Sequence, residues 1–216
     1  MTYDAVIFDN DGVLVELPSR EVFRRATERT FREFDMRRPT RDDVRALVAG
    51  NVEGIRQLCQ RHRVDAMDFC YEAAANAVRE QKRELEVGLR SLYDDVHAVW
   101  SLDAPFGLVS NNQHEAVTYV LRFFGIEDRF EAVYGCPFTP EGLRRMKPDP
   151  YYLNEALSDL GTRDALYVGD SACDVEAAAN AGIDSALLTR GRPVECEVAP
   201  TYEIDGLDAL PALVRG

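Results

Sequence analysis

Two aspartates stand directly after the first apolar run of the sequence, in the segment Asp9-Asn10-Asp11-Gly12. Because Asp9 and Asp11 are two residues apart, an extended backbone points both side chains the same way, and the following glycine allows a sharp turn. One carboxylate of such a pair can attack phosphorus while the other handles the proton of the leaving group. Alone the pattern is weak, because acidic turns at strand ends are common and D-x-D-G also occurs in calcium loops.

A hydroxyl and two amides, Ser110-Asn111-Asn112, follow the apolar run over 105–109. Groups of this kind can bind phosphate oxygens at the end of a strand. They can equally cap a helix that begins near Gln113, so this cluster by itself does not decide between the two roles.

One lysine occupies a conspicuous place, in the segment Lys147-Pro148-Asp149-Pro150. Most lysines are solvated, and a proline-rich turn is an ordinary position for one. Of the 25 basic residues, however, only Lys82 and Lys147 are lysine. A compact ammonium retained at this position could neutralise both a carboxylate and a phosphate.

A last acidic pair, Asp170 and Asp174, follows the apolar run over 165–168 and opens a predicted helix. The two residues are four apart, so both side chains can face one crevice at the end of the strand. A hard cation prefers carboxylate oxygens there. The alternative is that Asp174 only caps the helix or occupies its first turn.

The elements that must position these residues alternate along the chain. Short apolar runs at 5–8, 105–109, 165–168 and 186–188 predict strands, and apolar spacing of three and four predicts helices over 115–124, 150–160 and 175–181. This alternation predicts an α/β fold with a mostly parallel sheet, whose ligands bind beyond the carboxyl ends of the strands.

The segment 18–88 interrupts the alternation. It is rich in Arg, Glu, Ala and Leu, and its periodicity predicts four helices, over 20–33, 41–48, 52–62 and 67–84. We therefore expect a core domain formed by 1–17 and 89–216, with 18–88 inserted into it as a helical cap domain.

The composition excludes several classes of function. A net charge of −13 at pH 7 repels polyanions, which argues against nucleic acid as a partner. No apolar run approaches the roughly 20 residues that span a bilayer, and the N-terminus lacks the pattern of a signal peptide. We therefore expect no membrane partner and a cytoplasmic location. The five cysteines include no C-x-x-C pair, so we expect reduced thiols.

The four clusters in this order, with a helical insert after the first, closely resemble the haloacid dehalogenase superfamily. The resemblance spans Asp9 to Asp174 and implies a Rossmann-like parallel sheet with helices on both faces and an inserted cap. It further implies a phosphoric monoester hydrolase, a phosphatase that uses Mg²⁺, acts on a small phosphorylated metabolite and exists as a monomer or homodimer.

By this resemblance Asp9 would be the nucleophile and a Mg²⁺ ligand, and Asp11 the general acid and base with its main-chain carbonyl on the metal. Asp170 would bind Mg²⁺ directly, and Asp174 directly or through water. The transferring phosphoryl group would be bound by Ser110, Asn111 and Lys147, and Lys147 would also pair with Asp9. Phosphoryl transfer needs such positioning and charge neutralisation.

The position of the insert resembles the subgroup that contains phosphoglycolate phosphatase, β-phosphoglucomutase and the dehalogenases. Asp11 argues against a dehalogenase, and Gly169 before Asp170 resembles the phosphatases, because the mutases carry an acid there. Phosphoglycolate is the first expectation for the substrate, with a sugar or polyol phosphate close behind. The alternatives are a phosphomutase of the β-phosphoglucomutase type and a non-catalytic regulatory relative that binds a partner through the cap.

Two further features of the sequence each allow two interpretations. The scarcity of lysine beside an excess of carboxylates resembles halophilic proteins, although a GC-rich genome would also favour arginine. In the insert, Asn51 and Arg56 could reach the substrate or could lie on a solvated helix face.

Overall fold

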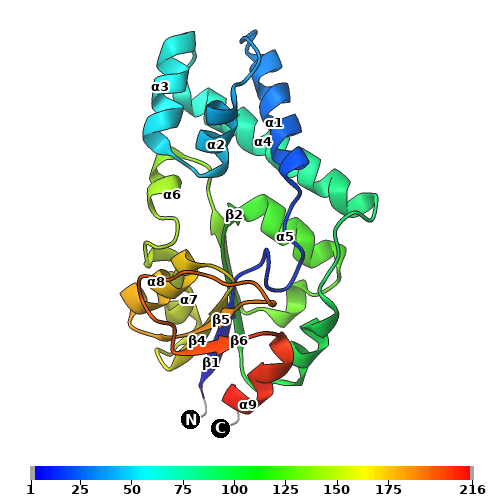
Figure 1. Cartoon of the computed structure of the whole chain (residues 1–216), viewed down its shortest axis with the longest axis vertical. Coiled ribbons are helices and arrows are strands. Elements are labelled where there is room, and N and C mark those ends of the chain that lie inside the picture. The colour runs from blue at the N-terminus through cyan, green and yellow to red at the C-terminus, as the bar shows by residue number, and fades with distance from the viewer. Residues whose placement is uncertain (1–2, 215–216) are drawn as a thin grey trace. The chain divides into compact units, whose positions relative to one another are not determined.

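The computed structural model describes residues 3–214. The chain forms two compact units (Figure 1): the first comprises Met1–Leu17, Ser91–Gly135 and Arg145–Gly216, and the second comprises Pro18–Arg90 and Cys136–Arg144. The prediction placed residues 136–144 in the core domain, whereas in the structure they belong to the helical unit. The roles of core and cap domain stay predictions.

The first unit is built on a six-stranded sheet in the order β3-β2-β1-β4-β5-β6. Its strands are β1 (Ala5–Phe8), β2 (Phe106–Gln113), β3 (Ala132–Cys136), β4 (Ala165–Gly169), β5 (Asp184–Leu188) and β6 (Tyr202–Ile204). The central strand β1 runs parallel to both neighbours, with Phe8 opposite Leu108 in β2 and Val168 in β4. The parallel sheet that the sequence predicts is confirmed.

Side chains of successive strand residues enter two different cores, because they point to opposite faces of the sheet. Val6 and Phe8 pack on one face, with residues of α5 (His114–Phe123), α9 (Leu210–Val214) and the 3₁₀ helices η1 (Asp94–Ser101) and η3 (Leu207–Ala209). Ala5 and Ile7 pack on the other, with α7 (Tyr151–Leu160) and α8 (Ala172–Ala181). Helices therefore cover both faces, as expected.

Three local predictions need correction. Strands β3 and β6 were not predicted: the apolar run at the start of β3 is only three residues long and was overlooked, and β6 contains no continuous apolar run. Strand β2 extends to Gln113, so 110–112 form its carboxyl end and do not follow it. Helix α8 begins at Ala172, three residues earlier than the predicted start.

The second unit contains α1 (Arg20–Glu33), α2 (Arg41–Val48), α3 (Val52–His62), α4 (Ala66–Glu86) and the short α6 (Pro140–Arg144). The first four match the predicted helices, and each is preceded by an N-cap residue whose side chain accepts a main-chain N–H, namely Ser19, Thr40, Asn51 and Asp65. Phe31 of α1 and Phe69 of α4 form the centre of its core, with ring centroids 6.0 Å apart.

A further 3₁₀ helix, η2, spans Glu127–Arg129. Within residues 3–214, no helix has both the length and the apolar character needed to cross a membrane. The five cysteines are all free thiols, in agreement with the sequence.

Candidate active site

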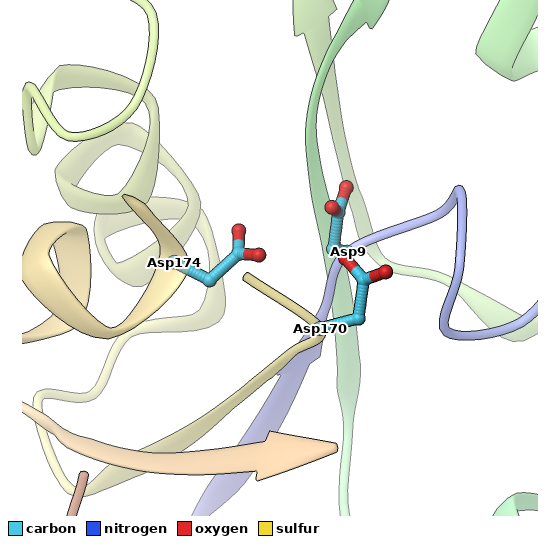
Figure 2. Close-up of side chains that lie close together, drawn as sticks. All are labelled: Asp9, Asp170 and Asp174. Carbon is cyan, nitrogen blue, oxygen red and sulfur yellow. The ribbon is translucent and has the colours of Figure 1, made fainter. Parts of the chain in front are cut away.

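The predicted residues converge at the carboxyl edge of the sheet. Asp9 follows β1, Asp170 follows β4, and the side chain of Asp174 extends from the first turn of α8 toward both (Figure 2). Each carboxylate offers an oxygen, and these three oxygens lie within 4.8 Å of one another. Because β1 and β4 are parallel neighbours, their ends bring distant parts of the sequence together.

Two glycines make this approach possible. Gly12 has a φ of +86°, and a Cβ placed on it would lie 2.1 Å from Oδ2 of Asp170. A Cβ on Gly169 would lie 2.2 Å from the Cβ of Asp174. Any side chain at either position would displace one of the carboxylates.

Lys147 lies at the centre of the cluster, and its side chain is only 2% exposed. Its Nζ lies 3.2 Å from Oδ2 of Asp9 and 2.6 Å from Oδ1 of Asp174. Burial acts against the ammonium charge, but the Asp174 and Asp9 carboxylates outweigh burial and hold the pKa of Lys147 above its ordinary value. The lysine is therefore a permanent cation between two acids.

Burial makes the charged forms of Asp9 and Asp170 less favourable and raises the pKa of both. Burial raises the pKa of Asp9 to about 7; Lys147 opposes the rise, and Asp174 and Asp11 add to it. Burial and then Asp174 raise the pKa of Asp170 to about 6. A cation that binds both carboxylates would relieve this cost.

The donor set fits a hard divalent cation such as Mg²⁺, which prefers carboxylate oxygens. Three acids share one lysine, which leaves a negative excess. The Asp170 carboxylate makes no hydrogen bond or ion pair within residues 3–214, so it is available to a metal. In Asp174, Oδ1 accepts from Lys147, and Oδ2 accepts from the main chain and hydroxyl of Ser171. Asp174 is thus both a first-turn acid, in a capping box whose N-cap is Ser171, and part of the cluster.

The Asp11 carboxylate lies outside this set of ligands and is held by amides. Its Oδ1 accepts a hydrogen bond from Nδ2 of Asn10 at 2.8 Å, and its Oδ2 accepts one from Nδ2 of Asn112 at 2.7 Å. Both oxygens are oriented by neighbours, which suits a group that transfers protons and does not suit a fourth carboxylate ligand.

Ser110 and Asn111 end β2 beside the acids. Ser110 is 2% exposed, and its Oγ accepts from the main chain of Asn112, which leaves its proton for another acceptor. The Asn111 side chain instead bonds the main chain of Lys147 in both directions, accepting at 2.8 Å and donating at 3.1 Å. Asn111 thereby fixes the loop that carries the lysine.

Residues 6–188 match the model of the family described as haloacid dehalogenase-like hydrolase. The chain belongs to this family.

Named relatives of this hydrolase cover nearly its whole length. It is 27% identical to a phosphoglycolate phosphatase of Rhodobacter capsulatus, over 98% of this chain and 97% of that one. It is 25% identical to the pyrophosphatase PpaX of Listeria monocytogenes, over 97% and 95%. The crystal structure of CbbY from Rhodobacter sphaeroides in complex with phosphate has the same fold, with a TM-score of 0.71 and 21% identity over 97% of this chain and 96% of that one.

Several residues beside the hydrolase site were not singled out from the sequence. Arg190, after β5, donates to the main-chain oxygens of Gly12 and Val13 at 3.2 and 2.8 Å. It also forms a two-pronged pair with Asp95 at 3.0 and 3.1 Å and stacks on Tyr93. The sequence could have pointed to Arg190, because it follows a predicted apolar strand, as the other clusters do.

Asn51 and Arg56 have local roles in the helical unit. The Asn51 side chain accepts from the main chain of Gly54 and so caps α3. Arg56 pairs with Glu53 on an exposed face of the same helix. Arg56 therefore lies on a solvated helix face and Asn51 caps the helix, while contact of either residue with a substrate stays a prediction.

Proposed function

We propose that this haloacid dehalogenase-like hydrolase is a Mg²⁺-dependent phosphatase that hydrolyses a small phosphorylated metabolite through a phosphoryl group carried on Asp9. The observation that supports this most is the buried cluster, in which one lysine lies between Asp9 and Asp174 while the Asp170 carboxylate makes no hydrogen bond or ion pair with the part of the chain that the structure describes. A set of carboxylates and a fixed ammonium suits the binding of a phosphoryl group together with a cation.

Asp9 is the nucleophile in this proposal. Its Oδ1 is held by the main chain of Asn10 at 2.7 Å, and its Oδ2 faces Lys147. The carboxylate forms a bond to phosphorus as the bond to the leaving oxygen breaks, and Asp11 gives its proton to that oxygen. A water then attacks the phosphorus, Asp11 takes back a proton, and the Asp9–phosphorus bond breaks to release phosphate.

The remaining residues orient the phosphoryl group. The Ser110 hydroxyl has a proton to donate to a phosphoryl oxygen, and Lys147 neutralises negative charge on the group. Asn111 acts by holding the Lys147 loop. Asp9, Asp170 and Asp174, with the main-chain carbonyl of Asp11, would hold Mg²⁺, which supplies further charge neutralisation when bound.

Hydrolysis is favoured over a mutase reaction by the steric situation at Gly169. The mutases of the subgroup carry an acid at this position. Here a Cβ would collide with Asp174 at 2.2 Å, so an acid cannot be accommodated without moving that residue. The third carboxylate of the cluster comes from Asp174 instead.

Three classes of substrate are candidates, two of which occur in the names of the relatives. Phosphoglycolate remains the first candidate, a sugar or polyol phosphate is the second, and inorganic pyrophosphate joins them because of the Listeria relatives. We propose that the helical unit serves as the cap that selects among small substrates, since such caps exclude macromolecules and water.

The decisive experiment is replacement of the nucleophile, Asp9→Asn, assayed with a panel of phosphoglycolate, pyrophosphate and sugar phosphates. We expect loss of turnover with retention of the fold, because an amide cannot attack phosphorus. Asp4→Asn is the matched control, since Asp4 is an exposed acid at the opposite end of β1. Turnover of Asp9→Asn at the level of the control would contradict the assignment.

A regulatory, non-catalytic relative is the other possibility, and one inhibitor separates the two. Beryllium fluoride mimics a phosphoryl group bonded to a carboxylate, so in crystals soaked with it and Mg²⁺ we expect density joined to Asp9. Density held only by Ser110 and Lys147 would instead indicate a phosphate-binding module.

A further inference from the structure

One buried side chain beside the cluster has no role in the family pattern. Tyr167 lies in β4, three residues before Asp170, and is fully buried. Its ring packs in the core between the sheet and the helices α7 and α8. A phenylalanine would fill that space equally well, so packing alone does not explain the hydroxyl.

The hydroxyl meets the catalytic cluster directly. It accepts a hydrogen bond from Nζ of Lys147 at 2.7 Å and lies 3.0 Å from the main-chain oxygen of Val109, to which it donates. Oδ1 of Asp174 lies slightly farther away, at 3.2 Å. Burial, followed by the nearby acids, holds the pKa of Tyr167 well above its ordinary value, so the group stays a neutral phenol.

These contacts give the phenol a definite orientation. Its one proton points to the main-chain oxygen of Val109 within β2, with Oδ1 of Asp174 also within reach, and either acceptor leaves an oxygen lone pair aimed at the ammonium. Strands β4 and β2, which lie on either side of β1, therefore fix the position of a neutral acceptor next to Lys147.

The ammonium needs such an acceptor because its two acids are unequal partners. Nζ is 2.6 Å from Asp174 but 3.2 Å from Asp9, and the side chain is a flexible four-carbon stem. Without a third strong partner, the charge would move toward Asp174 and away from the nucleophile. The main-chain oxygen of Val109 also accepts a hydrogen bond from Nζ, but at 3.3 Å this bond is weaker.

We propose that Tyr167 is a positioning residue, whose hydroxyl fixes the Lys147 ammonium in front of Asp9. The consequence for catalysis rests on the proposed phosphatase function, because it is there that Lys147 must face the transferring phosphoryl group. The positional effect on the lysine does not rest on it.

The kinetic test is Tyr167→Phe, which removes only the hydroxyl. We expect kcat to fall roughly 10-fold with a smaller change in KM, because displacement of a catalytic group by a fraction of an ångström has effects of this order. The matched control is Tyr3→Phe. The Tyr3 hydroxyl is also hydrogen-bonded to a carboxylate, that of Asp184 at 2.6 Å, but it lies at the other end of β1. An equal loss of kcat in both variants would overturn the proposal.

The positional test uses the two lysines of the chain. Lysine labelled with ¹⁵N at Nζ gives two ammonium signals, from Lys147 and Lys82, and the second serves as an internal reference. In Tyr167→Phe we expect the Lys147 signal to shift and its protons to exchange faster with water, while the Lys82 signal stays unchanged. Tyr3→Phe should move neither signal. An unmoved Lys147 signal in Tyr167→Phe overturns the proposal.

A third measurement uses NMR on the unmodified protein and so does not depend on whether a variant folds. Cross-relaxation between the Lys147 ammonium and the ring protons of Tyr167 is expected, and its absence overturns the proposal. If the protein hydrolyses no phosphate ester, the proposed function fails, yet both NMR readings still decide the role of Tyr167.

Discussion

Acids and cations meet in two contrasting regions of this hydrolase. On the exposed surface of α1, hydrogen bonds from Arg24 and Arg25 lower the pKa of Glu21 to about 2. At the carboxyl edge of the sheet, Asp9 has Lys147 at 3.2 Å, and burial still raises its pKa to about 7. In both regions the cation lowers the pKa of the acid, but at Asp9 the effect of burial is larger and the pKa ends above its ordinary value.

The difference shows that removal of water dominates the buried cluster. An exposed ion pair replaces hydration that is easily regained, so its net contribution to stability is small. A buried acid has lost its hydration and depends on the cations fixed around it. The surface pairs of α1 are therefore dispensable, whereas each member of the buried cluster depends on the others.

The largest effect is expected from replacing Lys147, the cation that Asp9 and Asp174 share. Lys147→Met keeps the length of the side chain but leaves Asp9 and Asp174 without a positive partner. We expect loss of turnover and a fall of about 3–5 kcal/mol in the free energy of unfolding, the usual cost of removing one partner from a buried pair. Urea unfolding and steady-state kinetics measure both effects.

Arg24→Met is the matched change on the surface, where it removes the pairs with Glu21 and Glu28. We expect its melting temperature to shift by less than about 2 °C, with full activity. Similar losses of stability in the two variants would show that the two regions do not differ as described.

A milder change separates proton transfer from metal binding. Asp11→Asn should retain Mg²⁺ affinity, because its carboxylate is occupied by Asn10 and Asn112, but should lower kcat by roughly 10²-fold. Calorimetric titration with Mg²⁺ and steady-state kinetics test the two parts. Loss of Mg²⁺ binding with retained activity would reverse the assigned roles.

The pH dependence of stability should also differ between the two acids. In metal-free protein the folded-state pKa of Asp9 is raised from 3.8 to about 7, so the native state binds the extra proton and is destabilised as pH rises between these values. Glu21 acts in the opposite direction, because its pKa is lowered to about 2; its contribution is lost as pH falls from its ordinary range toward that value.

Urea unfolding from pH 4 to pH 7 without metal measures the Asp9 effect. The slope should flatten in Asp9→Asn, which has no proton to lose. An unchanged slope in this variant would show that burial of Asp9 does not control stability over this range.

Salt should affect the surface and leave the buried cluster nearly untouched. The net charge of −13 causes self-repulsion, and the Debye length falls from about 10 Å at 0.1 M to about 3 Å at 1 M. We expect the melting temperature and the activity to rise modestly with KCl. A flat or falling melting temperature would attribute the scarcity of lysine to codon bias and remove the halophilic interpretation.

Much of this architecture is local and so could be predicted from the sequence. The run Ala5–Phe8 is buried throughout and forms β1 as predicted, and α1 to α3 have the predicted bounds because their apolar spacing and capping residues agree. The rarity of lysine drew attention to Lys147. Each of these signals lies within a few neighbouring residues.

What was missed depends on contacts between distant segments. Arg190 bonds Gly12 across 178 positions, and Tyr167 looks like any apolar strand residue until the fold brings Lys147 to its hydroxyl. Strand β6, only three residues long, forms because β5 offers it an edge. No local pattern contains this information.

The Arg190 contacts also bear on how short a fragment of this chain can be and still keep its site intact. The match to the family model stops at residue 188, and every residue assigned a chemical role precedes it. A fragment cut there would keep all four motifs but lose the guanidinium that ties the main chain of Gly12 and Val13 to Asp95. The loop that carries Asp11 would lose this anchor, so a chain complete in its motifs would still be incomplete as an enzyme.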